Sequence, residues 1–203
     1  MAFIIYVGFL LFAVFGRIAL HYRQLGDSGV RMVSRDAPFV MRLASLLLII
    51  SSSATFLLVT LDFIGLLHQD DVLSHWVVAQ WGKGATQVGM GFALLGMFVT
   101  VVSQLQMGRH WRIGVDENET TGLVTTGIYH YVRNPIYTGV MLFGFGIALM
   151  LPGIPMTIGM ALGLVAIIIQ VRCVEEPHLY RLHGARFREY VRSTGRYWPR
   201  LKA

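Results

Sequence analysis

Long apolar runs separated by short polar segments dominate the chain. A helix of about 20 apolar residues crosses a bilayer, and five runs approach that length: residues 2–20, 39–67, 85–107, 135–151 and 156–171. The last two are the shortest, and the uncharged sequence LPGIPM between them carries two prolines and a glycine that interrupt a helix. We therefore predict an all-α integral membrane protein with about five transmembrane helices, the last two forming a short helical hairpin.

Basic residues are concentrated in alternate connections between these runs. Residues 21–38, residues 108–134 and the tail after 176 are rich in arginine, whereas residues 68–84 hold a single lysine. Because basic loops stay on the cytoplasmic side, we expect the N-terminus outside and the tail in the cytoplasm. The first run has no basic segment before it, so we expect a retained helix rather than a signal peptide. The compact chain favours a prokaryotic inner membrane.

Composition supports a single membrane domain over residues 1–203, with three helices in 1–107 and the hairpin and tail in 108–203. The chain is 55% hydrophobic and only 14% charged, whereas soluble domains have about 25% charged residues. The net charge of +6 follows the membrane topology, and we expect no nucleic-acid partner. The one cysteine, Cys173, excludes an intramolecular disulfide, and we interpret it as a small apolar filler.

The sequence GIYHYVRNPIYTG sets polar and aromatic residues against the fourth apolar run. Asn134 followed by Pro135 is typical of a helix start, with Asn134 as the N-cap. The free N–H groups and the dipole of such a helix attract a carboxylate or phosphate. Tyr129 and Tyr137 add aromatic surface around this helix mouth. The alternative is an interfacial anchor followed by a transmembrane helix, with no ligand.

A second polar cluster, Arg172, Glu175 and Glu176, follows the fifth run directly. Arg172 and Glu176 are four residues apart and share a face if the helix continues. They could form only a surface ion pair, worth under about 1 kcal/mol, but charged groups at a membrane edge are candidates for function. If the hairpin brings its polar ends together, Asn134 and Glu176 become neighbours and the two clusters are walls of one pocket.

The tail after Glu176 alternates apolar and basic residues. We predict a cytoplasmic amphipathic helix along the lipid headgroups, and a lid over the pocket is the alternative. His178 and His183 are five residues apart and fall on different helix faces, so we predict no metal site.

Two segments together resemble the isoprenylcysteine carboxyl methyltransferase family and its bacterial and archaeal relatives, a set that includes membrane phospholipid N-methyltransferases. They are TTGLVTTGIYHYVRNPIYTG and, about 35 residues on, RCVEEPHLYRLHGARFREYVRSTGRYWPRL. The resemblance covers roughly the C-terminal 85–90 residues. The first three runs match only in hydropathy.

The resemblance implies S-adenosyl-L-methionine as methyl donor, bound in a cytoplasm-facing pocket of residues 108–203 between the last two helices and the tail. The family's cofactor positions fall on Thr121, Gly122, Leu123, Val124, Tyr129, Asn134, Pro135, Ile136, Tyr137 and Glu176. Its substrate-binding position, which we take as catalytic, falls on Arg172. The family commonly has histidine where this chain has Asn134, so a role for a titrating imidazole is lost there.

The implied function is methyl transfer to a lipophilic acceptor that enters from the bilayer, with a carboxylate of isoprenylcysteine type as the leading choice. A phospholipid amine or a thiol is the alternative acceptor. A non-catalytic membrane carrier or assembly protein is the alternative of another class, although no polar residues cross the membrane midplane as a carrier would need. The carboxylate of the cofactor suits the helix mouth, and its ammonium group suits a glutamate. Its adenine suits the aromatic walls. The acceptor's identity and the oligomeric state stay open.

Overall fold

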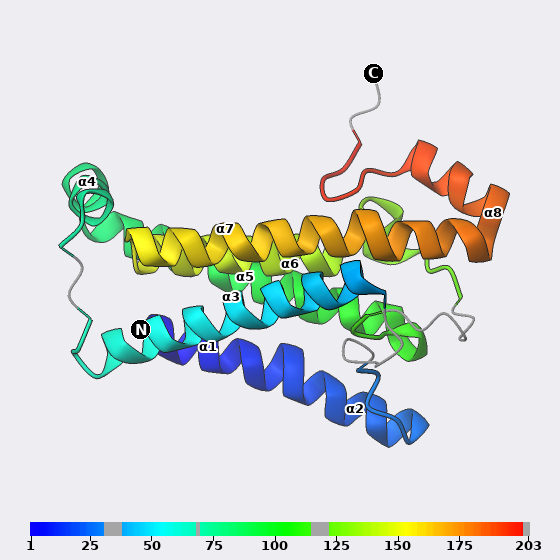
Figure 1. The fold of residues 1–203 in the computed structure, drawn as a ribbon, viewed down its shortest axis with the longest axis horizontal. Helices are drawn as coiled ribbons and strands as arrows, with labels where there is room; N and C mark the ends of the chain where they lie inside the picture. The colour runs from blue at the N-terminus through cyan, green and yellow to red at the C-terminus, as the bar shows by residue number, and fades with distance from the viewer. Residues whose placement is uncertain (31–37, 68–69, 115–121, 201–203) are drawn as a thin grey trace.

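The computed structural model describes residues 1–30, 38–67, 70–114 and 122–200. Its helices run side by side in an elongated bundle, with a shorter helix across one end (Figure 1). The helices are α1 (Ala2–Phe9), α2 (Gly16–Leu25), α3 (Phe39–Phe63), α4 (Val72–Trp81), α5 (Lys83–Met107), α6 (Pro135–Met150), α7 (Ile154–Ile169) and α8 (Glu176–Ser193). The π-helical segments Leu10–Phe15 and Gln170–Glu175 join α1 to α2 and α7 to α8, and 3₁₀ turns occupy Gly108–His110 and Gly127–His130.

Four helices in the described residues are long and apolar enough to cross a membrane. They are Ala2–Leu25, Phe39–Phe63, Gly84–His110 and Ile154–Ser193. The fourth predicted span is α6, whose 16 residues fall short of the usual length. The integral membrane class is confirmed, whereas the count of five spans stays a prediction.

Two predicted helix ends were wrong, because an apolar run and the helix that contains it can end at different residues. The first helix continues past the apolar run to Leu25, and Gly26, in the left-handed region at φ 73°, ends it. The second ends at Phe63 rather than at residue 67, since Gly65 takes φ 74°.

Helix α4 was not predicted, because its sequence was interpreted as a connection. Asp71 caps it by accepting a hydrogen bond from Ser74 N at 2.9 Å, and its second oxygen accepts from Ile154 N at 3.0 Å. The same carboxylate therefore holds the start of α4 to the start of α7. The helix lies across the end of the bundle opposite to α2 and α8 (Figure 1).

Glycines allow α5 and α6 to pack in close contact. A Cβ on Gly96 would lie 2.4 Å from Phe143 N, and one on Gly146 would lie 2.4 Å from Ala93 N. The two backbones therefore meet without side chains between them. The glycine-rich part of α5 therefore serves helix packing.

Helices α6 and α7, predicted to pair as a hairpin, pack mainly on other helices, so the hairpin stays a prediction. A short turn joins α6 to α7, but α6 packs chiefly on α5, and α7 packs chiefly on α3. An apolar core that includes Phe9, Phe143 and Ile147 fills the space between α1 and α6, with the Phe9 and Phe143 rings stacked at 4.1 Å.

The C-terminal segment breaks and turns back on the bundle. Gly184, at φ 48° and ψ −116°, interrupts α8, and the second half with its tail lies at the α8 end in Figure 1. Phe187 and Tyr190 are buried, so these apolar residues pack against the protein rather than on lipid headgroups. Arg133 N donates to Gly195 O at 2.8 Å, which ties the tail beside the start of α6.

Candidate functional site

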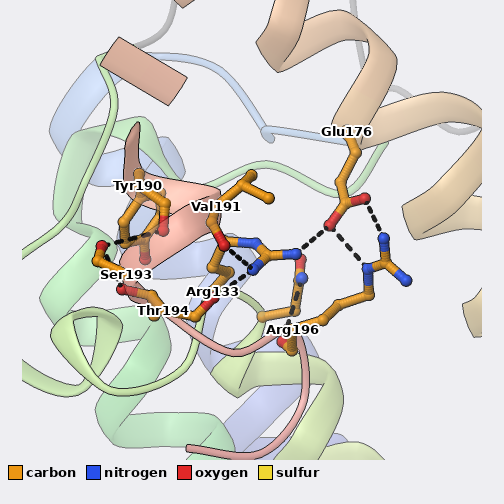
Figure 2. Close-up of polar contacts among 8 residues, drawn as sticks. Arg133, Glu176, Tyr190, Val191, Ser193, Thr194 and Arg196 are labelled. Atoms are coloured by element: carbon orange, nitrogen blue, oxygen red, sulfur yellow. Dashed lines mark hydrogen bonds and ion pairs between the residues drawn. The ribbon is translucent and has the colours of Figure 1, made fainter. Parts of the chain in front are cut away.

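Glu176 lies at the centre of the polar end and is clamped by two arginines (Figure 2). Arg133 Nη2 is 3.0 Å from Glu176 Oε1. Arg196 approaches as a fork, with Nε 2.8 Å from Oε1 and Nη2 2.7 Å from Oε2. Such two-pronged pairing is the strong geometry for a guanidinium and a carboxylate. The hydrogen bonds that Arg196 donates to the Glu176 carboxylate raise the pKa of Arg196, which keeps this arginine charged.

Arg133 also binds the backbone of the tail. Its Nη1 donates to the carbonyls of Thr194 and Val191 (Figure 2). One side chain therefore connects the segment before α6, the start of α8 and the residues after it. The prediction that the two polar clusters lie together is confirmed by these contacts.

Asn134 occupies the N-cap position and Pro135 the first position of α6, as predicted. The Asn134 side chain, however, does not cap the helix. Its Nδ2 donates instead to Arg196 O at 3.3 Å, and its backbone N–H donates to the same carbonyl at 3.0 Å. The expected cap was wrong because the tail, 62 residues away in the chain, offers a competing acceptor.

Tyr129 forms a rigid wall beside this helix start. Its hydroxyl donates to Ser103 O at 3.1 Å, and its own carbonyl accepts from the Tyr190 hydroxyl. Burial of the phenol raises the pKa of Tyr129, so the ring stays neutral.

Two adjoining cavities are lined by the predicted cofactor residues. A small one of about 90 Å³ is lined by Gly122, Leu123, Val124, Tyr129, Asn134 and Glu176 among others. A larger one of about 530 Å³ is lined by Tyr129, Asn134, Pro135, Ile136 and Tyr137 among others. The predicted cofactor residues within the described ranges thus all line one cavity or the other, and Tyr129 and Asn134 line both. Thr121 lies outside the described residues.

The cavity sizes indicate which space can hold a ligand. Pockets for small molecules measure about 300–1,000 Å³, so the small cavity alone cannot hold a nucleoside-sized molecule. The large cavity can, and it is lined also by the basic residues His110, Arg112 and His178.

A third, apolar cavity of about 520 Å³ adjoins the large one deeper in the bundle. Phe9, Leu48, Val140 and Ile167 line both. The large cavity near the polar end of the protein therefore adjoins a space suited to hydrocarbon.

Tyr137, Glu175 and Gln170 form a hydrogen-bonded cluster in the large cavity, and the sequence patterns did not indicate Gln170. The Tyr137 hydroxyl donates to Glu175 Oε1, and Gln170 Nε2 donates to the same oxygen at 3.3 Å. Gln170 is buried, with 1% of its surface exposed. Its place within an apolar run concealed it, although a lone amide five residues before a glutamate was a usable signal.

Arg172 is exposed and is absent from the residues that line the three cavities. The expectation that it shares a face with Glu176 was wrong, since Glu176 is buried. The π-helical segment between them has i→i+5 hydrogen bonds, so a spacing of four no longer aligns two side chains. Cys173 is exposed as well, and therefore does not fill a core as expected.

Comparisons with known proteins identify relatives of this chain. Residues 85–186 match the family model PEMT, phospholipid methyltransferase. The protein-S-isoprenylcysteine O-methyltransferase of Schizosaccharomyces pombe is 29% identical over 107 residues, which cover 52% of this chain and 45% of that protein. This chain thus matches less than half the length of that curated relative.

A solved structure shows the same fold over nearly the whole chain. The eukaryotic intramembrane Ras methyltransferase ICMT (isoprenylcysteine carboxyl methyltransferase) superposes with a TM-score of 0.56 at 20% identity, covering 98% of this chain and 68% of the other. The family model covers half of the present chain, from the start of α5 into α8. On these grounds, the protein belongs to the phospholipid methyltransferase family.

Proposed function

We propose that this protein is a methyltransferase that uses S-adenosyl-L-methionine and methylates a lipophilic acceptor within the membrane. The observation that carries the proposal is the meeting of two cavities at Tyr129 and Asn134, both lined by the family's motif residues, and the larger of the two also adjoins an apolar space.

The residues present suit the cofactor's functional groups. The first-turn N–H groups of α6 point toward the α6 start and favour a carboxylate. Glu176 suits an ammonium but is already paired twice. Arg196, with 30% of its side chain exposed, is more easily displaced than Arg133 with 7%. Cofactor binding would therefore exchange the Arg196 contact for the ligand's ammonium and keep the Arg133 contact.

The cofactor would supply an activated methyl group on a sulfonium. What the chain must contribute is alignment of acceptor and donor and exclusion of water, rather than an acid–base triad. Buried Tyr129 and the tail around Thr194 would hold one wall rigid, while the apolar cavity would orient the acceptor's hydrocarbon.

Two acceptor chemistries have support. The name of the yeast relative favours a carboxylate of isoprenylcysteine type, for which Arg172 is the proposed catalytic and substrate-binding residue, acting from the rim because its side chain is exposed. The matched family model favours a phospholipid amine. A thiol is a third choice, with no supporting contact.

The membrane arrangement is part of the proposal. We propose that α6 is a short membrane span paired with α7, which brings the number of spans to five. The N-terminus would then lie outside. The α8 end would face the cytoplasm, because α2, which has Arg23 in its last turn, and the basic helix α8 both lie at that end (Figure 1). The exposed basic face of α8 would rest on the headgroups of a prokaryotic inner membrane.

Binding of S-adenosylhomocysteine to the purified protein in detergent tests the proposal. Calorimetry should detect binding to the wild type, at least tenfold weaker binding to Glu176→Ala and Tyr137→Ala, and unchanged binding to Glu189→Ala, whose side chain is exposed. If the folded wild type binds nothing, a carrier or assembly protein is the better reading. Transfer of labelled methyl to amine, thiol and prenylcysteine acceptors, with Arg172→Ala alongside, would then identify the acceptor.

A further inference from the structure

The π-helical segment Gln170–Glu175 places its first and last residues together. Within it Gln170 Nε2 lies 3.3 Å from Glu175 Oε1, a contact that an α-helix, with its i→i+4 spacing, does not favour. Both residues line the large cavity. π-Helical turns of this kind occur frequently at functional sites.

The hydrogen bonds determine which atoms remain available. Tyr137 OH and Gln170 Nε2 both donate to Glu175 Oε1. The Gln170 amide cannot flip without turning its oxygen toward that carboxylate, so the donor role of Nε2 is set by its partner. Gln170 Oε1 is left buried at the cavity wall, with no hydrogen-bond partner among the described residues.

A buried acceptor without a partner is unfavourable, and a ligand that donates a hydrogen bond removes that penalty. Half-buried Glu175 adds a carboxylate at the same wall. Two oxygen-bearing groups thus define one place in the large cavity that favours an N–H or O–H and repels another carboxylate.

We propose that Gln170 and Glu175 form the subsite for the acceptor's polar head, and that this subsite binds an N–H or O–H donor of the acceptor. The inference rests on the proposed function and extends it to the acceptor side. In an amine acceptor the donor is the amine itself, and in an isoprenylcysteine acceptor it is the amide N–H beside the carboxylate.

The remaining charges of the cavity do not alter this assignment. Basic side chains of His110, Arg112, Arg133 and His178 also line it, so an anionic group can be held elsewhere in the same space. At this wall Gln170 Oε1 is the acceptor left without a partner, because the Tyr137 hydroxyl and one of the two hydrogens on Gln170 Nε2 are already donated to Glu175 Oε1.

Photolabelling in lipid nanodiscs tests the subsite with two nearly isosteric probes. They are dodecanamide and methyl dodecanoate, each with a diazirine in the chain, and only the amide has N–H donors. We expect the amide to label cavity-lining residues at least fivefold more than the ester, and a matched alkyl carboxylate to label no better than the ester. Gln170→Leu and Glu175→Gln should each reduce the preference for the amide to below twofold, while Glu189→Gln should leave it unchanged.

The outcomes separate this inference from the proposed function. Equal labelling by amide and ester in the wild type, or a preference that survives in both cavity variants, overturns the subsite even when S-adenosylhomocysteine binds normally. If S-adenosylhomocysteine fails to bind but the amide preference depends on Gln170 and Glu175, the subsite stands and the methyltransferase proposal fails. Circular dichroism and thermal unfolding of each variant establish that it is folded before labelling is compared.

Discussion

Arg133 and Glu176, 43 residues apart in the chain, form an ion pair of 3.0 Å with 7% and 10% of their side chains exposed. The pair joins the start of α6 to the start of α8, on which the polar end of the protein depends. Glu176 also pairs with Arg196, whose side chain is more exposed, at 30%. The two arginines should therefore contribute unequally to stability.

Glu176→Gln should destabilise the protein by about 3 kcal/mol, because loss of one partner leaves the buried Arg133 charge uncompensated. Arg196→Gln should cost about 1 kcal/mol or less, since a partly exposed pair contributes little. Thermal and denaturant unfolding in detergent would measure both. Equal losses for the two variants would contradict the assignment of Arg133 as the structural partner.

Gly96→Ala should destabilise the bundle by about 1–3 kcal/mol, the usual cost of overpacking. The new methyl would lie 2.4 Å from Phe143 N and 2.5 Å from Gly139 O, so two helix backbones would have to separate. Gly91→Ala is the matched control, because nothing lies within 4 Å of a Cβ there. It should be neutral or slightly stabilising through helix propensity, and a loss equal to that of Gly96→Ala would refute close α5–α6 contact.

Asp71→Asn should loosen α4 and make stability less dependent on acid pH. The backbone N–H groups of Ser74 and Ile154 hold the pKa of Asp71 below its usual value. A carboxylate with a lowered folded pKa stabilises the fold above its unfolded pKa, and this contribution is lost as pH falls through the folded pKa. The free energy of unfolding, measured from neutral pH to pH 3, should therefore fall less steeply with acid in Asp71→Asn than in the wild type.

Exposed Asp70 provides the control for this variant. Asp70→Asn should retain the wild-type pH profile and the wild-type hydrogen–deuterium exchange of α4. If Asp71→Asn also leaves exchange in α4 unchanged, the carboxylate is not what fastens this helix to α7.

Gly184→Ala should cost about 1 kcal/mol, because only glycine adopts φ 48° readily. A Cβ there meets nothing within 4 Å, as is also true at Gly144, so the comparison isolates the backbone conformation. Gly144→Ala should not destabilise. Limited proteolysis of the tail should accelerate in Gly184→Ala alone, and equal cleavage in both variants would show that the break in α8 does not position the tail.

Local patterns predicted much of this protein from sequence. Apolar runs placed α1, α3, α5, α6 and α7, and the Asn134–Pro135 pair marked where α6 begins. The polar clusters before α6 and after α7 could also be predicted, because each lies directly beside an apolar run. These features follow from hydropathy and from φ/ψ preferences of neighbouring residues, which a linear pattern contains.

Other features depend on the exact geometry of the folded chain, which the linear pattern does not contain. Asn134 binds Arg196 instead of capping its helix, and Gln170 and Glu175 meet only because the helix widens there. Arg172, in the same widened segment, is exposed and does not line the cavities described above. The sequence by itself determined the membrane class, the start of α6 and the candidate chemistry. Tertiary structure alone decided which polar groups pair and which remain for a ligand, because hydrogen-bond partners compete through space and not along the chain.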